Sequence, residues 1–285
     1  MMNILVTGAN GQLGNEMRRQ AEKSRNRYIF TDVEELDITD IDAVVKYVDT
    51  EEVDVVINCA AYTNVEKAED DERTAMLINC SAVENLAVAC KLRNALLIHV
   101  STDYVFNGKD CLPLTEERPT APIGAYGRTK LAGERALQET GCRYMIFRTA
   151  WLYSEFGNNF VKTMMRLTAE RDTLNVVFDQ VGTPTYAADL ASLISHIIEN
   201  DLLSHEGVYH FSNEGVCSWY DFAVEIADIA GNKCDVRPCH SDEFPSKVER
   251  PHFSVLDKSK VKATFAYNVP HWKESLRICM SRMNK

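Results

Sequence analysis

The stretch that decides the fold is NILVTGANGQLG, residues 3–14. Its short apolar start predicts a buried strand, and apolar residues at helical spacing follow the glycines. Gly8 permits a tight turn, Gly11 lets the backbone approach a bound group, and Gly14 allows close helix packing. A helix that starts at such a turn presents unpaired N–H groups to phosphates. The stretch therefore predicts a dinucleotide-binding turn, with a merely structural turn as the alternative.

Strands and helices alternate through the first half of the chain. The predicted strands are Asn3–Thr7, Tyr28–Asp32, Val53–Asn58, Leu96–Ser101 and Arg143–Arg148. The predicted helices are Gln12–Lys23, a helix from an N-cap at Thr39 to Glu51, Thr74–Leu92 and Tyr126–Glu139. Short connections between these units predict an α/β fold, a Rossmann-type doubly wound parallel sheet.

The second half is less regular and predicts a smaller α/β substrate-binding lobe. The expected elements are helices at Asn158–Arg171, Ala187–Glu199, Ser218–Ala230 and from Pro270, and strands at Leu174–Phe178 and Gly207–Phe211. The charged segment Cys234–Ala263 is broken by prolines. We expect residues 1–150, with returning segments at about 180–211, to form the dinucleotide-binding domain. Residues at about 151–179 and 212–285 would form the lobe.

Composition excludes several function classes. The 285 residues are 45% hydrophobic and 26% charged, which is ordinary for a globular protein. A net charge of −11 argues against nucleic-acid binding, which depends on cationic surfaces. No apolar run approaches the ~20 residues of a membrane span, and no secretory signal is recognisable. We expect a cytoplasmic protein without a membrane partner, its nine cysteines reduced thiols.

Asp32 ends the second predicted strand, where an acidic side chain can accept hydrogen bonds from an adenosine ribose. A 2′-phosphate would need a nearby cation, and Thr31–Asp42 contains no Arg or Lys. The position favours NAD, although Arg18 or Arg19 could reach it, so both NADPH and NADH stay open. The alternative for Asp32 is a solvated loop carboxylate.

A second polar group follows the fourth predicted strand. Ser101-Thr102-Asp103 ends that strand, and Tyr126 and Lys130 share one helix face because they are four residues apart. A lysine ammonium beside a tyrosine lowers the pKa of the phenol and can bind the nicotinamide ribose. The phenol then serves as a proton donor near neutral pH, and Thr102 can bind the same carbonyl oxygen. We expect Thr102, Tyr126 and Lys130 to be catalytic.

Several ordered segments resemble the dTDP-4-dehydrorhamnose reductases, a family of extended short-chain dehydrogenase/reductases. They are Thr7–Gly14, Glu35–Asp40, Asn58–Thr63, Ser101–Gly108, Tyr126–Glu134, Arg148–Tyr153 and Asp179–Thr185. The resemblance covers nearly the whole chain, and Ser101–Gly108 and Arg148–Tyr153 are more specific than the superfamily motifs. It implies reduction of the C4 keto group of dTDP-4-dehydro-L-rhamnose to dTDP-L-rhamnose by NADPH or NADH, in polysaccharide biosynthesis.

The resemblance also implies roles for the matching positions. Those implied at the cofactor are Gly8, Asn10, Gly11, Gln12, Leu13, Gly14, Asp32, Asp37, Ile38, Ala60, Ala61, Tyr62, Tyr126 and Lys130. Those implied at the dTDP-sugar are Thr102, Asp103, Tyr126, Trp151, Asn159 and Arg250. A core aromatic is the alternative for Trp151, and a surface ion pair is the alternative for Arg250. Asn79 is either the support of a proton relay or a capped core asparagine.

Two other functions compete with this one. The first is an NAD-dependent sugar-nucleotide epimerase or dehydratase; such dehydratases carry an Asp-Glu pair where this chain reads Asp103-Tyr104. The second is a non-catalytic regulatory subunit that resembles that of methionine adenosyltransferase, which would not need an intact catalytic trio.

The resemblance bears on metal and assembly as well. Some family members are described as Mg²⁺-linked dimers held by glutamates, so a homodimer is compatible with the resemblance. Glu16 stands at one such position, and Asp189 offers only an aspartate near another. A single glutamate at a helix start is more often a dipole partner than a ligand. No metal is therefore predicted.

Overall fold

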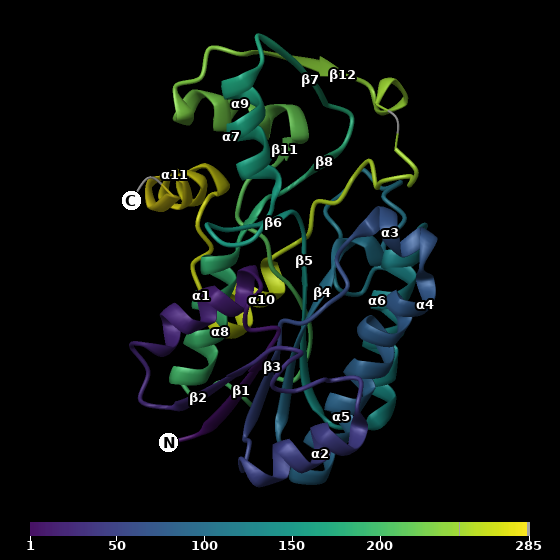
Figure 1. Ribbon diagram of the computed structural model, residues 1–285, viewed down its shortest axis with the longest axis vertical. Helices are drawn as coiled ribbons and strands as arrows, with labels where there is room; N and C mark the ends of the chain where they lie inside the picture. The colour runs from purple at the N-terminus through teal and green to yellow at the C-terminus, as the bar shows by residue number, and fades with distance from the viewer. Residues whose placement is uncertain (245, 284–285) are drawn as a thin grey trace.

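The centre of the molecule is a parallel sheet of six strands, seen in a computed structural model that describes residues 1–244 and 246–283 (Figure 1). The strand order is β10-β5-β4-β3-β1-β2, and each neighbouring pair is parallel. The strands are β1 (Asn3–Thr7), β2 (Arg27–Thr31), β3 (Val55–Asn58), β4 (Leu96–Thr102), β5 (Arg143–Thr149) and β10 (Gly207–His210). The predicted doubly wound α/β fold is confirmed.

Helices cover both faces of this sheet (Figure 1). One layer holds α1 (Gln12–Ala21), α8 (Ala187–Glu199) and α10 (Ser259–Phe265); the other holds α2 (Ile41–Thr50), α5 (Ala82–Arg93) and α6 (Ala125–Thr140). Alternate residues of β1 pack into the two layers, Val6 into the first and Leu5 into the second. Because both faces are buried, the strands are nearly continuously apolar.

A long helical run precedes β4. It consists of α4 (Glu72–Met76), a π-helical turn η1 (Leu77–Ser81) and α5, and α3 (Val65–Asp70) lies before it. By length and hydropathy the run 72–93 is apolar enough to span a membrane. Its buried Val83 and Leu86 pack on the sheet, however, as in the core helix of a globular fold. Sequence reading missed α3, which begins where the Asn64 side chain accepts a hydrogen bond from the backbone of Lys67.

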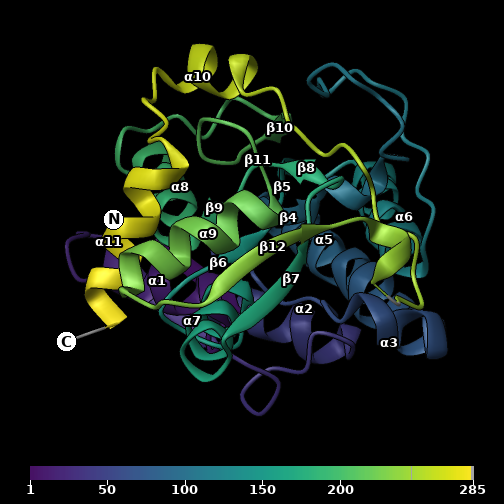
Figure 2. The same ribbon diagram turned by 90° about the horizontal axis from the view of Figure 1, so that it is seen from above.

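A smaller lobe lies beyond the carboxyl ends of the strands (Figures 1 and 2). Its larger elements are α7 (Phe160–Glu170), β7 (Thr173–Val177), α9 (Trp219–Ala230), β12 (Asp235–Cys239) and α11 (Trp272–Met283). Short pieces join it to the sheet: η2 (Asp103–Val105), β6 (Leu152–Tyr153), β8 (Val181–Gly182), β9 (Thr185–Tyr186), β11 (Cys217–Ser218) and η3 (Ser241–Glu243). The lobe has its own core, centred on Phe222 and Leu276.

Some predicted boundaries were wrong. The N-cap of α2 is Asp40, whose carboxylate accepts from the backbone of Asp42 and Ala43, whereas the Thr39 hydroxyl donates to Asp37. The last helix starts after Pro270, because the Pro270 carbonyl accepts a hydrogen bond from the backbone N–H of Glu214.

The segment Cys234–Ala263 is more ordered than its prolines suggested. It contributes β12, whose Pro238 is tolerated because the strand has a single partner, β7. It also begins α10, and Val261 and Phe265 of that helix join the core of the sheet rather than that of the lobe.

Candidate active site

The turn between β1 and α1 is built from glycines that have no room for side chains. Gly8 has a φ of +63°, and a Cβ on it would lie 2.6 Å from the backbone nitrogen of Ala60. A Cβ on Gly14 would lie 2.5 Å from the carbonyl oxygen of Gly8. Gly11 is the N-cap of α1 and brings no side chain to the helix N-terminus. The turn therefore offers backbone N–H groups to an anionic ligand.

A pocket of ≈ 520 Å³ follows the ends of β1, β2 and β3. We call it the strand-end pocket; its lining includes Gly8, Gly11, Asp32, Asp37, Ile38, Ala60 and Ala61. Asp32 Oδ2 accepts a hydrogen bond from the backbone of Asn10 at 3.0 Å, so this carboxylate also braces the glycine turn. Arg18 stacks over the Phe30 ring at 4.4 Å, and Arg19 binds Glu155 at 2.7 Å.

A second cavity, of ≈ 540 Å³, joins the sheet to the lobe; we call it the central cavity. Its lining includes Gly11, Gln12, Leu13, Thr102, Asp103, Tyr126, Lys130, Trp151, Asn159 and Arg250. The structure therefore brings the three expected catalytic residues together with all the expected sugar residues. Thr102 and Trp151 come at or just after the carboxyl ends of the neighbouring parallel strands β4 and β5, and α6 brings Tyr126 and Lys130 to the same cavity.

Tyr126 and Thr102 form the polar end of the central cavity. Burial raises the pKa of Tyr126, and a hydrogen bond with Thr102 opposes that rise. The Tyr104 ring packs edge-on against the Tyr126 ring, with centroids 5.4 Å apart. Tyr126 therefore keeps its proton at neutral pH, as a proton donor must.

Lys130 makes different contacts from those expected. Its Nζ donates to the carbonyl oxygen of Val100 at 2.7 Å and lies 3.4 Å from Nε2 of His99. Burial lowers the pKa of Lys130 to about 8, and the charge of Glu134 partly opposes this. The expected lowering of the Tyr126 pKa is not seen in this structure, because burial and the charges of Asp103 and Tyr104 all raise this pKa and only the hydrogen bond with Thr102 opposes them.

Asp103 is a buried carboxyl group, with 3% of its surface exposed. Its Oδ1 accepts a hydrogen bond from the Thr102 hydroxyl at 3.1 Å, and its Oδ2 has no partner among the described residues. Burial raises the pKa of Asp103 to about 7. The side chain can therefore act as either donor or acceptor toward a sugar hydroxyl.

Trp151 lies in the central cavity with a positive φ of +50°, an uncommon conformation for a bulky residue. Its ring stacks on Trp219, with centroids 3.6 Å apart and planes 11° apart. Trp219 was not among the predicted site residues, because nothing in its local pattern separates it from a core residue of α9.

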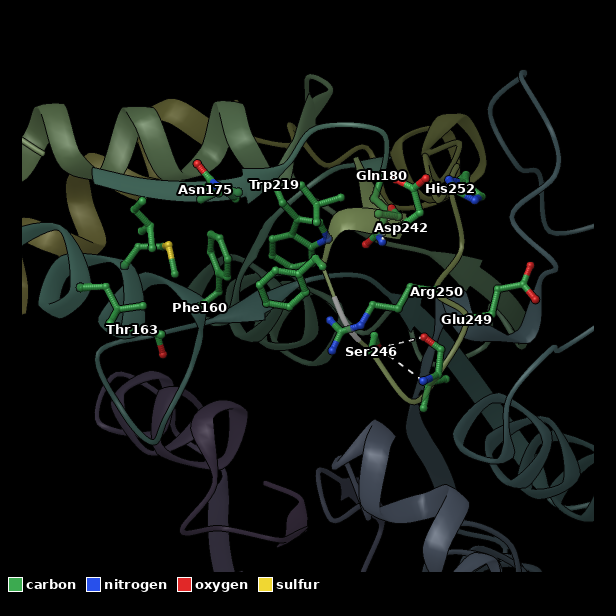
Figure 3. Close-up of a pocket in the computed structure, with 18 of the residues that line it drawn as sticks. Phe160, Thr163, Asn175, Gln180, Trp219, Asp242, Ser246, Glu249, Arg250 and His252 are labelled. Carbon is green, nitrogen blue, oxygen red and sulfur yellow. Dashed lines mark hydrogen bonds between the residues drawn. The ribbon is translucent and has the colours of Figure 1, made fainter. Parts of the chain in front are cut away.

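A third cavity, of ≈ 890 Å³, lies within the lobe, and we call it the lobe cavity. Trp219 and Arg250 line both it and the central cavity, so the two are adjacent. Figure 3 shows the Arg250 side chain extending across this space toward the side that holds Phe160 and Trp219. Arg250 also lies 3.8 Å from Glu66, which is a loose ion pair. Aromatic faces next to one arginine suit a base and a diphosphate.

Asn159 and Asn79 bind other parts of the chain and so hold segments around the site in place. The Asn159 amide nitrogen donates to Gln12 at 3.0 Å while its oxygen caps α7, so it links the lobe to the glycine turn. Asn79 is fully buried and binds both backbone groups of Tyr62, at 2.9 and 3.1 Å. Asn79 therefore fits the reading of a core asparagine that holds the Tyr62 loop.

Glu16 is buried rather than free at the helix start. It lies against Arg19 at 3.2 Å, and burial together with Glu155 raises its pKa to about 7. Asp189 is engaged by Asn213 and Ser275. Among residues 1–244 and 246–283, no three His, Cys, Asp or Glu side chains are grouped to hold a metal ion. These residues do not fit a magnesium site within one chain.

The fold and the site define a class: a Rossmann-type oxidoreductase with a tyrosine–lysine pair beside a dinucleotide-binding turn. Residues 2–285 match the model of the family described as RmlD substrate binding domain. The dTDP-4-dehydrorhamnose reductase of Aggregatibacter actinomycetemcomitans is 38% identical over 97% of this chain and 98% of its own length.

Solved structures agree with this relationship. A dTDP-4-dehydrorhamnose reductase from Clostridium acetobutylicum is 44% identical, with a TM-score of 0.96 over 100% of both chains. Another, from Bacillus anthracis in complex with NADP, is 40% identical, with a TM-score of 0.93 over 99% of both chains. The chain belongs to the dTDP-4-dehydrorhamnose reductase family.

Proposed function

We propose that this protein reduces the C4 keto group of dTDP-4-dehydro-L-rhamnose to give dTDP-L-rhamnose, using NADPH or NADH. The observation that carries the proposal is the placement of Thr102, Tyr126 and Lys130 in the central cavity, which adjoins the aromatic lobe cavity. The sugar would occupy the first cavity and the nucleotide the second.

The glycine turn, the strand-end pocket and Lys130 would hold the dinucleotide. The backbone N–H groups of the glycine turn would bind the pyrophosphate, and Asp32 would face the adenosine ribose. The reduced nicotinamide supplies a hydride when it is bound. Because Asp32 already binds the Asn10 backbone, it orders the turn before the cofactor arrives.

The chain's own residues would bind and protonate the sugar. Trp151 and Asp103 would hold the ring, and the Tyr126 phenol would give its proton to the oxygen on C4. The Thr102 hydroxyl, which donates to Asp103 in this structure, would turn to donate its one hydrogen bond to the same oxygen and stabilise the charge that develops there. Arg250 would pair with the diphosphate, while Asn159 keeps the lobe against the glycine turn.

The dehydratase alternative lacks its second carboxylate. Tyr104 stands in place of the glutamate of the Asp-Glu pair, and its ring packs against Tyr126 instead of presenting an acid. The regulatory alternative is opposed by the buried and intact catalytic trio. The homodimer and the cytoplasmic location both stay predictions.

Dinucleotide oxidation with dTDP-4-dehydro-L-rhamnose tests the proposal. We expect one NADPH or NADH oxidised per sugar reduced, measured by absorbance and by product analysis. Tyr144→Phe is the matched control, because Tyr144 lies on β5 outside the central cavity. Conversion of the sugar without net oxidation would favour an epimerase or dehydratase. Partner capture without turnover would favour a regulatory subunit.

A further inference from the structure

A buried polar chain runs from the glycine turn to Lys130. The Thr7 hydroxyl and the Ala60 backbone N–H both donate to Asn58 Oδ1, at 2.8 and 3.1 Å. Asn58 Nδ2 lies 3.1 Å from His99 Nδ1, and His99 Nε2 lies 3.4 Å from Lys130 Nζ. Asn58, His99 and Lys130 are each at most 1% exposed, so water does not replace these partners.

The orientation of each group in this chain follows from one backbone N–H. The Ala60 N–H can only donate, so the Asn58 atom that faces it must be the amide oxygen. The Asn58 NH₂ group then faces His99 Nδ1 and donates to it. Nδ1 is therefore an acceptor without a proton, and the single proton of a neutral imidazole must lie on Nε2.

His99 is neutral in this environment. Burial lowers the pKa of His99 far below its ordinary value, and the charge of Lys130 lowers it further. The Nε2–H therefore points at Lys130 Nζ. An ammonium group there would set two donors against each other, whereas a neutral amine accepts the hydrogen bond.

We propose that Asn58 and His99 are positioning residues that direct an Nε2–H donor at Lys130 and thereby favour its neutral amine over its ammonium form. This inference rests on the proposed function for its catalytic meaning, although the hydrogen-bond arrangement does not depend on it. After Tyr126 has given its proton to the sugar, the ammonium form of Lys130 would supply a proton toward the phenolate and become the amine that His99 stabilises; the amine would then regain a proton from water in the central cavity.

Other groups around Lys130 either favour its ammonium form or line the cavity without a hydrogen bond to the amine. Glu134, one turn along α6, favours the ammonium, but its carboxylate is shared with Arg148 at 2.6 Å. Tyr126, Asp103 and Cys59 line the same cavity. His99 contacts the amine itself, and unlike the others it presents a donor that a neutral amine can accept.

Nitrogen NMR of the full chain tests the tautomer without any activity assay. Two other histidines are internal references with the tautomer fixed by a carbonyl acceptor. His196 Nε2 lies 3.0 Å from the Phe265 carbonyl, and His210 Nδ1 lies 2.9 Å from the Leu114 carbonyl. We expect His99 to show the Nε2–H pattern of His196. The Nδ1–H pattern of His210, or a doubly protonated ring at pH 7, would overturn the proposal.

A pair of variants tests the effect on Lys130. His99→Gln keeps an N–H donor near the amine, whereas His99→Met keeps similar bulk without a donor. We expect the midpoint of the Lys130 titration, followed by ¹³C NMR at Cε, to rise by about 0.5–1 pH unit in His99→Met, the effect of one hydrogen bond. His99→Gln should stay near the unsubstituted protein. Equal midpoints in all three proteins would refute the proposal.

Kinetics then separates this inference from the proposed function. In an active reductase, the alkaline limb of the kcat profile should move upward in His99→Met with the NMR midpoint. If the protein showed no reductase activity but gave the expected NMR results, the proposed function would be wrong and the inference about His99 would stand. If the protein were an active reductase but His99→Met changed neither the alkaline limb of the kcat profile nor the NMR midpoint of Lys130, the proposed function would stand and the inference would be wrong.

Discussion

Three side chains in the central cavity, Asp103, Tyr126 and Lys130, favour their uncharged forms because they are buried. Burial raises the pKa of Asp103 to about 7, lowers that of Lys130 to about 8, and raises that of Tyr126. These shifts share one cause, the poor solvation of ions in a buried site. At neutral pH the phenol keeps its proton, while Asp103 and Lys130 each lie close to their titration midpoints. Small changes in their partners will therefore change the protonation of this site.

The first prediction at this scale concerns Tyr126 and Lys130. Tyr126→Phe removes the proton donor and leaves the glycine turn intact, so kcat should fall by roughly 10²–10⁴ while cofactor affinity changes little. Lys130→Met should weaken both turnover and dinucleotide binding. Because the two residues act as a unit, their effects should not multiply in the double variant. Single-turnover rates and cofactor dissociation constants measure this, and near-normal turnover of Tyr126→Phe would contradict the proton-donor role.

The second prediction concerns Asp32. Asp32→Asn keeps an acceptor for the Asn10 backbone and removes only the charge. Repulsion of a 2′-phosphate at contact distance is worth about 1 kcal/mol in water, so the NADPH/NADH ratio of kcat/KM should rise about fivefold. Asp42→Asn, in the first turn of α2, is the control. An unchanged ratio would show that Asp32 does not face the ribose.

Among the elements, α6 decides the geometry of the proposed catalytic group. It carries both Tyr126 and Lys130 and lies unusually close to two other segments. A Cβ on Gly127 would overlap the carbonyl oxygen of Tyr104, and one on Gly133 would overlap that of Asn79 in the π-helical turn. Glycine at position 127 therefore lets α6 approach the segment that follows Thr102 at the end of β4, and glycine at position 133 lets it approach the π-helical turn.

Gly133→Ala tests this packing. The added methyl group meets backbone, which cannot move aside cheaply, so we expect a loss of about 1–3 kcal/mol in the free energy of unfolding. Denaturant unfolding measures it. Arg135→Ala lies on the exposed side of the same helix and should change stability by less than about 0.5 kcal/mol. Equal stability of the two variants would show that the π-helical turn gives way to the side chain.

Across the whole molecule, one carboxylate joins the sheet to the segments that follow it. Glu155 comes after β6 and binds Arg19 of α1 at 2.7 Å and the Tyr186 hydroxyl at 2.9 Å. Arg282 of α11 donates to the same hydroxyl at 2.9 Å. Glu16 lies beside this group with a pKa raised to about 7, whereas the pKa of Glu155 is lowered, so the contact between α1 and the later elements contains one carboxyl group that titrates near neutrality.

The pH dependence of stability should reveal the titration of Glu16. Glu16 has a pKa of about 7 in the folded chain against an ordinary value of 4.5, so the folded state binds the extra proton. Its contribution to stability is complete below pH 4.5 and is lost as the pH rises to 7. Glu16→Gln cannot ionise, so its stability relative to the unsubstituted protein should increase between pH 5 and pH 8. Thermal unfolding at both pH values measures this, and the exposed Glu22→Gln should show no such trend.

Much of the fold could be predicted from the sequence because it depends on local patterns. Apolar strands, helical spacing and the glycine turn predicted the parallel sheet and its flanking helices. The Tyr126–Lys130 spacing and the strand-end Thr102 predicted the centre of the site. Short segments were missed, including α3 and β12, because a few residues carry too little periodicity and Pro238 reads as a break.

What the sequence by itself determined is the fold class, the glycine turn and the identity of the residues at the strand ends. Only the tertiary structure decided which side chains meet across elements: Trp219 on Trp151, His99 beside Lys130, and Glu155 against Arg19. The physical reason is the range of the forces. Turns and periodic burial depend on neighbouring residues, whereas stacking, hydrogen-bond direction and the solvation of charge depend on groups that folding brings together.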